Sequence, residues 1–148
     1  MRLELHFGDI TEYKADCIVN AARNSLLGGG GVDGAIHNAA GSELKEFCKT
    51  LGGCKVGEAK LSPAFNLPSK FIIHTVGPRF LFKSEEEIQD LKNCYSNSLK
   101  IANQERYETL VFSNISTGVY GFPKDLASKY SFEAVSYTHL TLPTSDLV

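Results

Sequence analysis

The sequence predicts an α/β fold, a sandwich in which helices cover a largely parallel or mixed sheet. Three short apolar runs are typical of strands: DCIVNAA at 16–22, KFIIHTVG at 70–77 and TLVFSNI at 109–115. Segments with helical patterns separate these runs. The chain has 148 residues and no internal repeat or low-complexity linker, so we expect a single folded domain.

The remaining elements of the first half follow from local patterns. MRLELHF at 1–7 alternates apolar and polar residues, which predicts a strand with one exposed face. Residues 32–40 read as a helix that Gly41 ends. Ser42 is the predicted cap of a second helix that runs to about Leu51. GEAKLSPAF, at 57–65, predicts another strand.

A long helix dominates the second half of the prediction. Ser84 and Glu87 have the spacing of a capping box. The apolar positions that follow mark one helix face, and they are Ile88, Leu91, Tyr95, Leu99 and Ala102. A last predicted helix begins at Pro123.

Composition excludes several classes of protein. The chain is 43% hydrophobic and 22% charged, as in ordinary soluble globular proteins. Its net charge of −2 disfavours a protein whose main role is to wrap nucleic acid, although a local basic patch is compatible with it. No apolar run approaches the roughly 20 residues of a membrane span, and no signal peptide follows Met1. We therefore expect a cytoplasmic protein with no membrane partner.

The cysteines and histidines do not predict a metal site. The four cysteines (Cys17, Cys48, Cys54 and Cys94) form no C-x-x-C pair and have no histidine at zinc-ligand spacing. We interpret them as reduced, mostly buried thiols. His37 and His74 lie far apart in the sequence and are interpreted as packing or hydrogen-bonding residues.

Two glycine-rich loops follow predicted strands, at 28–31 and at 115–123 (ISTGVYGFP). In open α/β sheets ligands bind at the carboxyl ends of strands, where glycine lets backbone N–H groups approach and a helix N-terminus adds positive potential. The two loops together predict a clamp for a diphosphate; alternatively, the glycines only permit tight connections. Neither loop has the P-loop or G-x-G-x-x-G spacing, which disfavours a nucleotide triphosphatase and a Rossmann dehydrogenase.

Six sequence blocks resemble a known family. They are GDIT (8–11), IVNAA (18–22), LLGGGGVDGAIH (26–37), AAG (39–41), HTVGP (74–78) and ISTGVYGFP (115–123). In this order, over residues 1 to about 135, they look like a macrodomain of the MacroD-like group of ADP-ribosyl hydrolases. The resemblance implies a three-layer α/β/α sandwich with a mixed, largely parallel central sheet. It also implies binding of ADP-ribose, removal of mono-ADP-ribose from acidic side chains and deacetylation of O-acetyl-ADP-ribose, without a cofactor. We expect the protein to act as a monomer.

The end of the chain departs from this pattern. SYTHLTLPTSDLV, at 136–148, has Thr and Pro punctuation, no helical period and no clear buried strand. It is similar to a translated adapter sequence. We therefore expect a macrodomain over 1–135, a non-family tail over 136–148, and a fold that lacks its last C-terminal element.

The resemblance makes Asp33 the catalytic residue. The aspartate of GGVDG is taken in this group as the carboxylate beside the distal ribose, where it would orient or deprotonate a water that attacks the anomeric carbon or the ester carbonyl. From the residues alone, an aspartate in the first turn of a helix is better explained by the helix dipole than by catalysis.

The resemblance also assigns the ligand contacts. Asp9 would accept a hydrogen bond from the adenine amino group, Ile10 would address the ring, and Asn20 would reach the distal ribose. Asp9 as a turn or cap residue and Asn20 in a local backbone hydrogen bond are the alternatives. The other contacts lie in the two loops: Gly30, Gly31 and Val32 at the distal ribose and its phosphate, then Ser116, Thr117, Gly118, Val119, Tyr120 and Gly121 at the diphosphate, and Phe122 over the ribose end. Phe122 is equally explained by core packing.

One site residue departs from the family. Members read VNAAN, whereas this chain reads VNAARN, so that Arg23 stands where the last asparagine would contact the distal ribose, and Asn24 follows it. Arginine is longer, charged and cannot accept a hydrogen bond. It would pair with Asp33 or the diphosphate, or block the ribose pocket, and Asn24 would substitute only if the loop shifts. Two functions therefore stand, an ADP-ribosyl-ester hydrolase and a non-catalytic ADP-ribose reader; RNA binding is a distant third.

Overall fold

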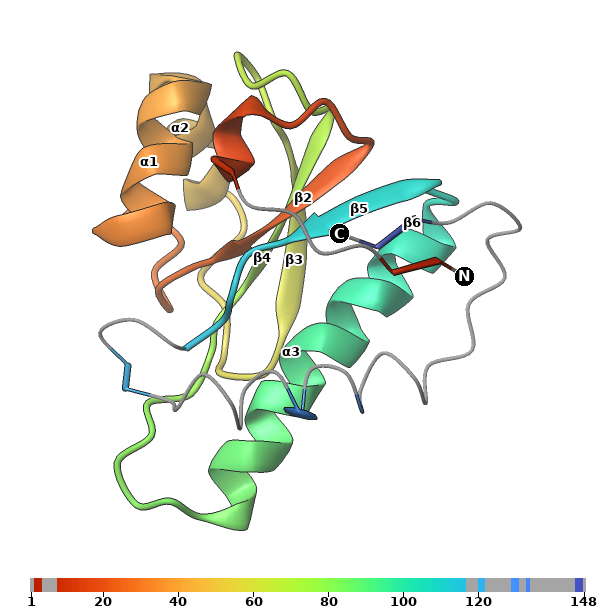
Figure 1. Cartoon of the computed structure of the whole chain (residues 1–148). Coiled ribbons are helices and arrows are strands. Elements are labelled where there is room, and N and C mark those ends of the chain that lie inside the picture. Colours follow the sequence, from red (N-terminus) through yellow and green to blue (C-terminus); the bar gives the residue numbers. More distant parts are fainter. Residues whose placement is uncertain are drawn as a thin grey trace.

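The computed structural model describes residues 2–3, 8–116, 120–121, 129–130, 133 and 146–147 (Figure 1). Their strands form one sheet in the order β1-β6-β5-β2-β4-β3. The strands are β1 (Arg2–Leu3), β2 (Cys17–Ala21), β3 (Ala59–Pro63), β4 (Phe71–Thr75), β5 (Thr109–Phe112) and β6 (Asp146–Leu147). All neighbours are parallel except β3 and β4, which are antiparallel. This confirms the mixed, largely parallel sheet.

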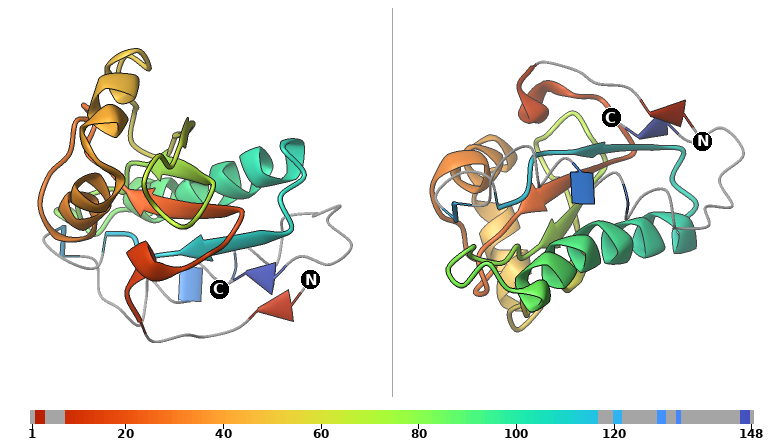
Figure 2. Two further views of the ribbon diagram at one scale, coloured as in Figure 1. Left: turned by 90° about the horizontal axis from the view of Figure 1, so that it is seen from above. Right: turned by 60° about the horizontal axis from the view of Figure 1, so that its bottom comes forward.

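Helices cover both faces of the sheet. They are α1 (Gly31–Ala40), α2 (Ser42–Lys49) and α3 (Glu85–Gln104), with a short 3-10 helix η1 (Ile10–Glu12) before β2. Side chains alternate along β2, so that Cys17 and Val19 join the apolar cluster under α3 while Ile18 joins the cluster under α1 and α2. In Figures 1 and 2 the α1–α2 pair and α3 lie on opposite sides of the strands. The three-layer α/β/α sandwich is confirmed.

The long helix begins where the sequence predicts. The Ser84 hydroxyl accepts from the Glu87 N–H, and the Glu87 carboxylate accepts from the Ser84 N–H, which completes the capping box. Glu87 also accepts the N–H groups of Leu81 and Phe82, and these bonds hold its pKa below the usual value, the Ser84 N–H first. The predicted apolar face of α3 lies against the sheet.

The junction of α1 and α2 differs from the prediction. Gly41 has φ +93°, donates its N–H to the His37 carbonyl oxygen and is also the residue that precedes α2. Ser42 is therefore the first helical residue and not the cap, because one glycine ends the first helix and begins the next. The predicted limits of α1 are confirmed to within one residue.

The expected loss of the last C-terminal element stays a prediction, although the tail does contribute one short strand. Asp146 and Leu147 form β6, which pairs in parallel with both β5 and β1. Figure 2 shows these two short strands side by side next to β5. A strand of two residues leaves no periodic pattern, so the sequence could not reveal it. That residues 136–148 lie outside the family pattern stays a prediction, and the helix predicted from Pro123 falls largely outside the described residues.

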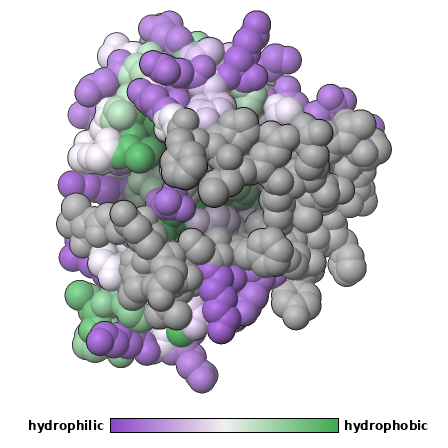
Figure 3. Space-filling model, viewed as in Figure 1, coloured by the Kyte–Doolittle hydropathy of each residue, from purple (hydrophilic) through white to green (hydrophobic). Residues whose placement is uncertain are grey.

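Among the described residues, the most exposed large hydrophobic side chains lie in one loop. Leu81 and Phe82, between β4 and α3, are 67% and 83% exposed. Figure 3 shows hydrophobic surface at the lower left, where this loop lies in Figure 1. None of the helices formed by the described residues has the length and apolar character needed to cross a membrane.

Candidate functional site

A cleft of about 1000 Å³ opens at the carboxyl ends of β2, β4 and β5. Its lining includes described residues from both predicted loops, and the segment just before η1. Of the residues predicted from the sequence, the cleft brings together Asp9, Ile10, Arg23, Asn24, Gly30, Gly31, Val32, Asp33, Ser116 and Tyr120. The predicted place of the site, outside the carboxyl ends of parallel strands, matches this cleft.

The other predicted site residues lie elsewhere. Asn20 is fully buried and contacts Asp33 instead of lining the cleft. Gly121 is exposed and is not part of the lining. Thr117, Gly118, Val119 and Phe122 lie outside the described residues.

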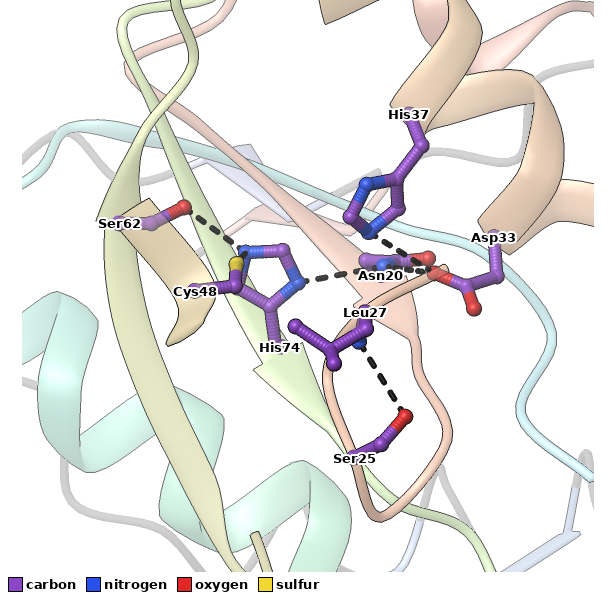
Figure 4. A network of polar contacts seen from close by, with 8 residues as sticks. All are labelled: Asn20, Ser25, Leu27, Asp33, His37, Cys48, Ser62 and His74. Carbon is purple, nitrogen blue, oxygen red and sulfur yellow. Dashed lines mark hydrogen bonds and ion pairs between the residues drawn. The ribbon is translucent and has the colours of Figure 1, made fainter. Parts of the chain in front are cut away.

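Asp33 accepts a hydrogen bond on one carboxylate oxygen, whereas its other oxygen is unpaired in the described part of the chain. It sits in the first turn of α1 and is 4% exposed. Its Oδ1 accepts from Asn20 Nδ2 at 2.8 Å, and His37 Nε2, one helical turn on, lies 3.5 Å from the same oxygen (Figure 4). Within the described part of the chain Oδ2 has no hydrogen-bond partner. A buried carboxylate with one unpaired oxygen beside a cleft is suited to bind a water or a ligand hydroxyl.

His74 and Ser62 continue the series of hydrogen-bonded groups on the side of Asn20 away from Asp33. The sequence alone did not connect these two residues to the site. His74 Nδ1 lies 3.2 Å from Asn20 Nδ2, and His74 Nε2 lies 2.8 Å from Ser62 Oγ (Figure 4). Burial, and then the nearby His37, lower the pKa of His74 to about 3, so the imidazole is neutral at pH 7. The interpretation of His74 as a hydrogen-bonding residue is supported. The parallel register pairs Asn20 with His74, and this register is not visible in the sequence.

Arg23 lies at the cleft beside the glycine loop. It is exposed, and a side-chain carbon placed on Gly29 would lie 2.5 Å from Arg23 Nε and 3.0 Å from Asp33 Oδ2. Arg23 and Asp33 therefore flank the same point, although no ion pair within 4.0 Å joins these two described residues.

Asn24 does not replace the missing asparagine. Its Nδ2 donates to the Cys54 carbonyl oxygen at 3.0 Å, and the Cys54 N–H donates back to the Asn24 carbonyl oxygen at 2.8 Å. These two bonds tie the residue to the segment after α2. A shift of the loop by one residue would break both of them.

Asp9 acts as a cap and still faces the cleft. Its Oδ1 accepts the Thr11 hydroxyl at 2.7 Å and the Thr11 N–H at 2.9 Å, which lowers the pKa of Asp9 below its usual value. The alternative interpretation of Asp9 as a cap is thus correct, and it leaves the exposed carboxylate at the cleft wall together with Ile10.

The second glycine-rich loop is fixed at both described ends. Ser116 has φ +65°, and a side chain on Gly77 would overlap Ser116 Oγ and Ile115. The Phe80 N–H donates to the Tyr120 carbonyl oxygen at 2.9 Å, and the Arg79 guanidinium lies 5.2 Å from the centre of the Tyr120 ring. Arg79 was missed from the sequence; a basic residue just after a predicted strand was its only signal.

The described residues include no cluster of three or more His, Cys, Asp or Glu side chains that could hold a metal ion. All four cysteines are free and buried. Burial raises the pKa of the Cys48 and Cys94 thiols to about 11 and also raises those of Cys17 and Cys54. These thiols are protonated at neutral pH, which makes them poor nucleophiles and poor ligands.

Comparisons with known proteins agree with this geometry. The sequence model of the family described as "Macro: Macro domain" matches residues 19–131. A Macro domain-containing protein of Ralstonia nicotianae is 54% identical over 127 residues, which are 86% of this chain and 74% of that protein. A protein of Pantoea vagans named O-acetyl-ADP-ribose deacetylase 1 is 46% identical over 134 residues, with 88% of this chain and 78% of that protein covered. The solved Trypanosoma brucei macrodomain in complex with ADP-ribose superposes with a TM-score of 0.88 at 35% identity, over 99% of this chain and 62% of that one.

Proposed function

This chain belongs to the Macro domain family, and from this premise we propose that its cleft binds ADP-ribose and hydrolyses ADP-ribosyl esters. The substrates we propose are proteins that carry mono-ADP-ribose on acidic side chains, and O-acetyl-ADP-ribose. The name of the Pantoea vagans relative and the ligand of the Trypanosoma brucei macrodomain support this proposal.

Binding follows from the lining of the cleft. The glycine loop before α1 brings backbone N–H groups and the positive end of a helix to one side, and the loop that contains Ser116 and Tyr120 faces it. Arg79 adds a positive charge at the same cleft. A diphosphate held between the loops would place the adenine near Asp9 and Ile10 and the distal ribose near Asp33.

The observation that best supports hydrolysis is the hydrogen bonding of the Asp33 carboxylate. The Asn20 amide donates to one carboxylate oxygen, and the other oxygen has no hydrogen-bond partner within the described part of the chain. That oxygen is placed to accept a hydrogen from a water and so direct its lone pair at the anomeric carbon or at the ester carbonyl. As the water oxygen bonds to the carbon, its proton passes to Asp33 Oδ2. The ester C–O bond breaks, the proton is passed on to the departing carboxylate or ribose oxygen, and the products leave through the open cleft.

A non-catalytic reader is the second candidate, and Arg23 favours it. The guanidinium is longer than the asparagine of the resembling family and lies next to the point that Asp33 Oδ2 also contacts. Arginine cannot accept a hydrogen bond, so it cannot take over every contact that an asparagine amide makes to the distal ribose. ADP-ribose binding would survive this change because both loops are intact.

Calorimetry with ADP-ribose, followed by an assay of O-acetyl-ADP-ribose hydrolysis, tests both candidates. Asp33→Ala should abolish hydrolysis and leave binding measurable. Glu43→Ala is the matched control, since Glu43 is an exposed acidic residue in the first turn of α2 and its loss removes a similar helix-dipole contact. Binding without hydrolysis selects the reader, and the absence of binding contradicts both candidates.

A further inference from the structure

We propose that His74 is a positioning residue for Asp33: as the neutral tautomer with its proton on Nε2, it fixes the Asn20 amide so that an N–H points at the Asp33 carboxylate. His74 does not line the cleft, so it acts through Asn20. The predicted effect on turnover rests on the proposed function, whereas the tautomer can be measured without it.

The orientation of the Asn20 amide follows from Asp33. An ionised carboxylate only accepts hydrogen bonds, so the Asn20 atom 2.8 Å from Asp33 Oδ1 must be the NH₂ group. The opposite orientation would place the amide oxygen against a negatively charged oxygen. One of the two amide hydrogens is thereby assigned.

The tautomer of His74 follows from the amide. The same NH₂ group lies 3.2 Å from His74 Nδ1, and two donors cannot bond to each other, so Nδ1 must be the acceptor. The ring proton is then on Nε2, 2.8 Å from Ser62 Oγ. The Ser62 hydroxyl in turn donates to the Pro63 carbonyl oxygen at 3.0 Å, which leaves its lone pair for the His74 proton. The donor and the acceptor are therefore assigned in every hydrogen bond of the series that runs from the Pro63 carbonyl oxygen to Asp33.

Burial prevents water from taking the place of any group in this series of hydrogen bonds. Asn20 and His74 are fully buried and Ser62 is 1% exposed, so water cannot replace a lost partner. Asn20 Oδ1 has no hydrogen-bond partner within the described part of the chain. The amide is therefore oriented through its NH₂ group alone, by His74 on one side and Asp33 on the other.

The neighbours of His74 disfavour the other tautomer, in which Nδ1 carries the proton. Cys48 Sγ lies 3.8 Å from Nε2, the His37 ring centre lies 6.4 Å from that of His74, and Asp33 is reached only through Asn20. Moving the proton to Nδ1 would set N–H against N–H, and the amide would rotate to turn its oxygen toward the imidazole. Asp33 Oδ1 would lose its donor and the carboxylate would be free to turn.

The first experiment reads the tautomer directly. Long-range ¹H–¹⁵N spectra of the native protein at pH 7 distinguish a proton on Nε2 from one on Nδ1, and the His74→Asn variant identifies the signal by its loss. We expect the Nε2–H form in the native protein, with or without ADP-ribose. A ring protonated on Nδ1, or on both nitrogens, overturns the proposal whatever the protein's activity.

The second experiment compares His74→Asn with His74→Gln. The carbonyl oxygen of asparagine takes the place of Nδ1 and keeps an acceptor for Asn20, whereas the amide nitrogen of glutamine takes the place of Nε2 and keeps only the donor to Ser62. Glutamine fills more of the ring volume, so its variant should be the more stable of the two. We expect kcat for O-acetyl-ADP-ribose nevertheless to be roughly 10- to 100-fold lower in His74→Gln than in His74→Asn, with similar affinity for ADP-ribose.

The two variants are expected to rank in one order by stability and in the opposite order by kcat, which separates a positioning role of His74 from a packing role. If activity follows stability, with His74→Gln the better enzyme, His74 acts only as a packing residue and the proposal is wrong. If the native protein binds ADP-ribose but hydrolyses nothing, the proposed hydrolase function fails, and the tautomer spectra alone decide this inference.

Discussion

Gly29 and Gly34 are in direct contact: a side-chain carbon built on Gly34 would lie 2.5 Å from the Gly29 carbonyl oxygen. The glycine loop therefore folds back onto the first turn of α1, where the Gly34 N–H also donates to the Gly30 carbonyl oxygen at 3.2 Å. At Gly34, glycine is needed for close approach of the backbone. This contact brings the loop to the Asp33 side of the helix.

Replacing Gly34 by alanine should therefore destabilise the protein. In an open helix this change stabilises by about 0.5–1 kcal/mol, but the overlap with Gly29 should reverse the sign and cost about 1–3 kcal/mol. Gly30→Ala is the control, since nothing lies within 4 Å of a side-chain carbon there. Denaturant midpoints measure both changes. A Gly34→Ala protein as stable as the native one would contradict the contact.

The strands were predictable because their apolar runs are local signals. Ile18, Ile72 and Val111 belong to three such runs and lie in one apolar cluster, as a parallel sheet requires. Helix ends were predictable where side chains mark them, as Ser84 does for α3. The prediction failed at Ser42, where a glycine shared by two helices takes the role of the cap, and at β6, which is too short to carry a pattern.

The cleft was predictable from the motifs, but the support of Asp33 was not. Gly-rich loops at strand ends indicate a ligand site from local sequence, and the position of Asp33 follows from its loop. The contact of Asn20 with His74, 54 residues apart, depends on the register of β2 against β4. Register is set by packing of the whole sheet, so no local pattern could reveal it.

His74 should make the protein less stable in acid. Burial lowers the folded pKa to about 3 from an ordinary value of 6.5, so below pH 6.5 the unfolded chain binds a proton that the folded chain excludes. The contribution of His74 is intact above the unfolded pKa and is lost as the pH falls from 6.5 toward 3, at a slope of up to about 1.4 kcal/mol per pH unit. Unfolding free energies of the native protein and of His74→Gln, measured across this window, should differ in slope. Parallel curves would show that His74 titrates normally in the folded state.

The diphosphate clamp predicts a ranking of ligands. AMP should bind much more weakly than ADP-ribose, because it cannot engage both loops. Gly77→Ala should displace Ser116 and lower the affinity for ADP-ribose roughly 10- to 100-fold, the value of one or two hydrogen bonds to a charged group. Calorimetry measures both ligands, and thermal unfolding checks that the variant is folded. Equal affinity for AMP and ADP-ribose would argue against the clamp, as would an unchanged ADP-ribose affinity in a folded Gly77→Ala protein.

Binding and turnover should not depend on a metal ion or on the thiols. The described residues hold no metal-ligand cluster, and burial raises the pKa of all four cysteines. We expect the ADP-ribose affinity and the hydrolysis rate to be unchanged after treatment with a chelator and in the presence of a reducing agent. Loss of turnover on chelation, restored by adding back one metal, would show a site that this prediction lacks.

Arg23 decides between the hydrolase and the reader, and Arg23→Asn is the variant that separates them. Arg23 is exposed and forms no ion pair with Asp33 within 4.0 Å in the described structure, so its removal should not disturb the fold or greatly change ADP-ribose affinity. If the position needs an amide beside the distal ribose, the new hydrogen bond acts in the transition state and appears in turnover. One hydrogen bond to a charged group contributes about 1.5–3 kcal/mol, which predicts a gain of roughly 10- to 100-fold in kcat.

Two further variants make this experiment complete. Arg23→Gln keeps an amide but not its distance from the backbone, so it should gain less than Arg23→Asn. Asp33→Ala should remove the activity in either background, because the added amide assists the carboxylate and does not replace it. Unchanged turnover in Arg23→Asn, with activity still lost in Asp33→Ala, would make Arg23 a tolerated residue of an ordinary hydrolase. If both Arg23 forms bind ADP-ribose and neither hydrolyses an ester, Asp33 serves recognition, and the protein is a reader.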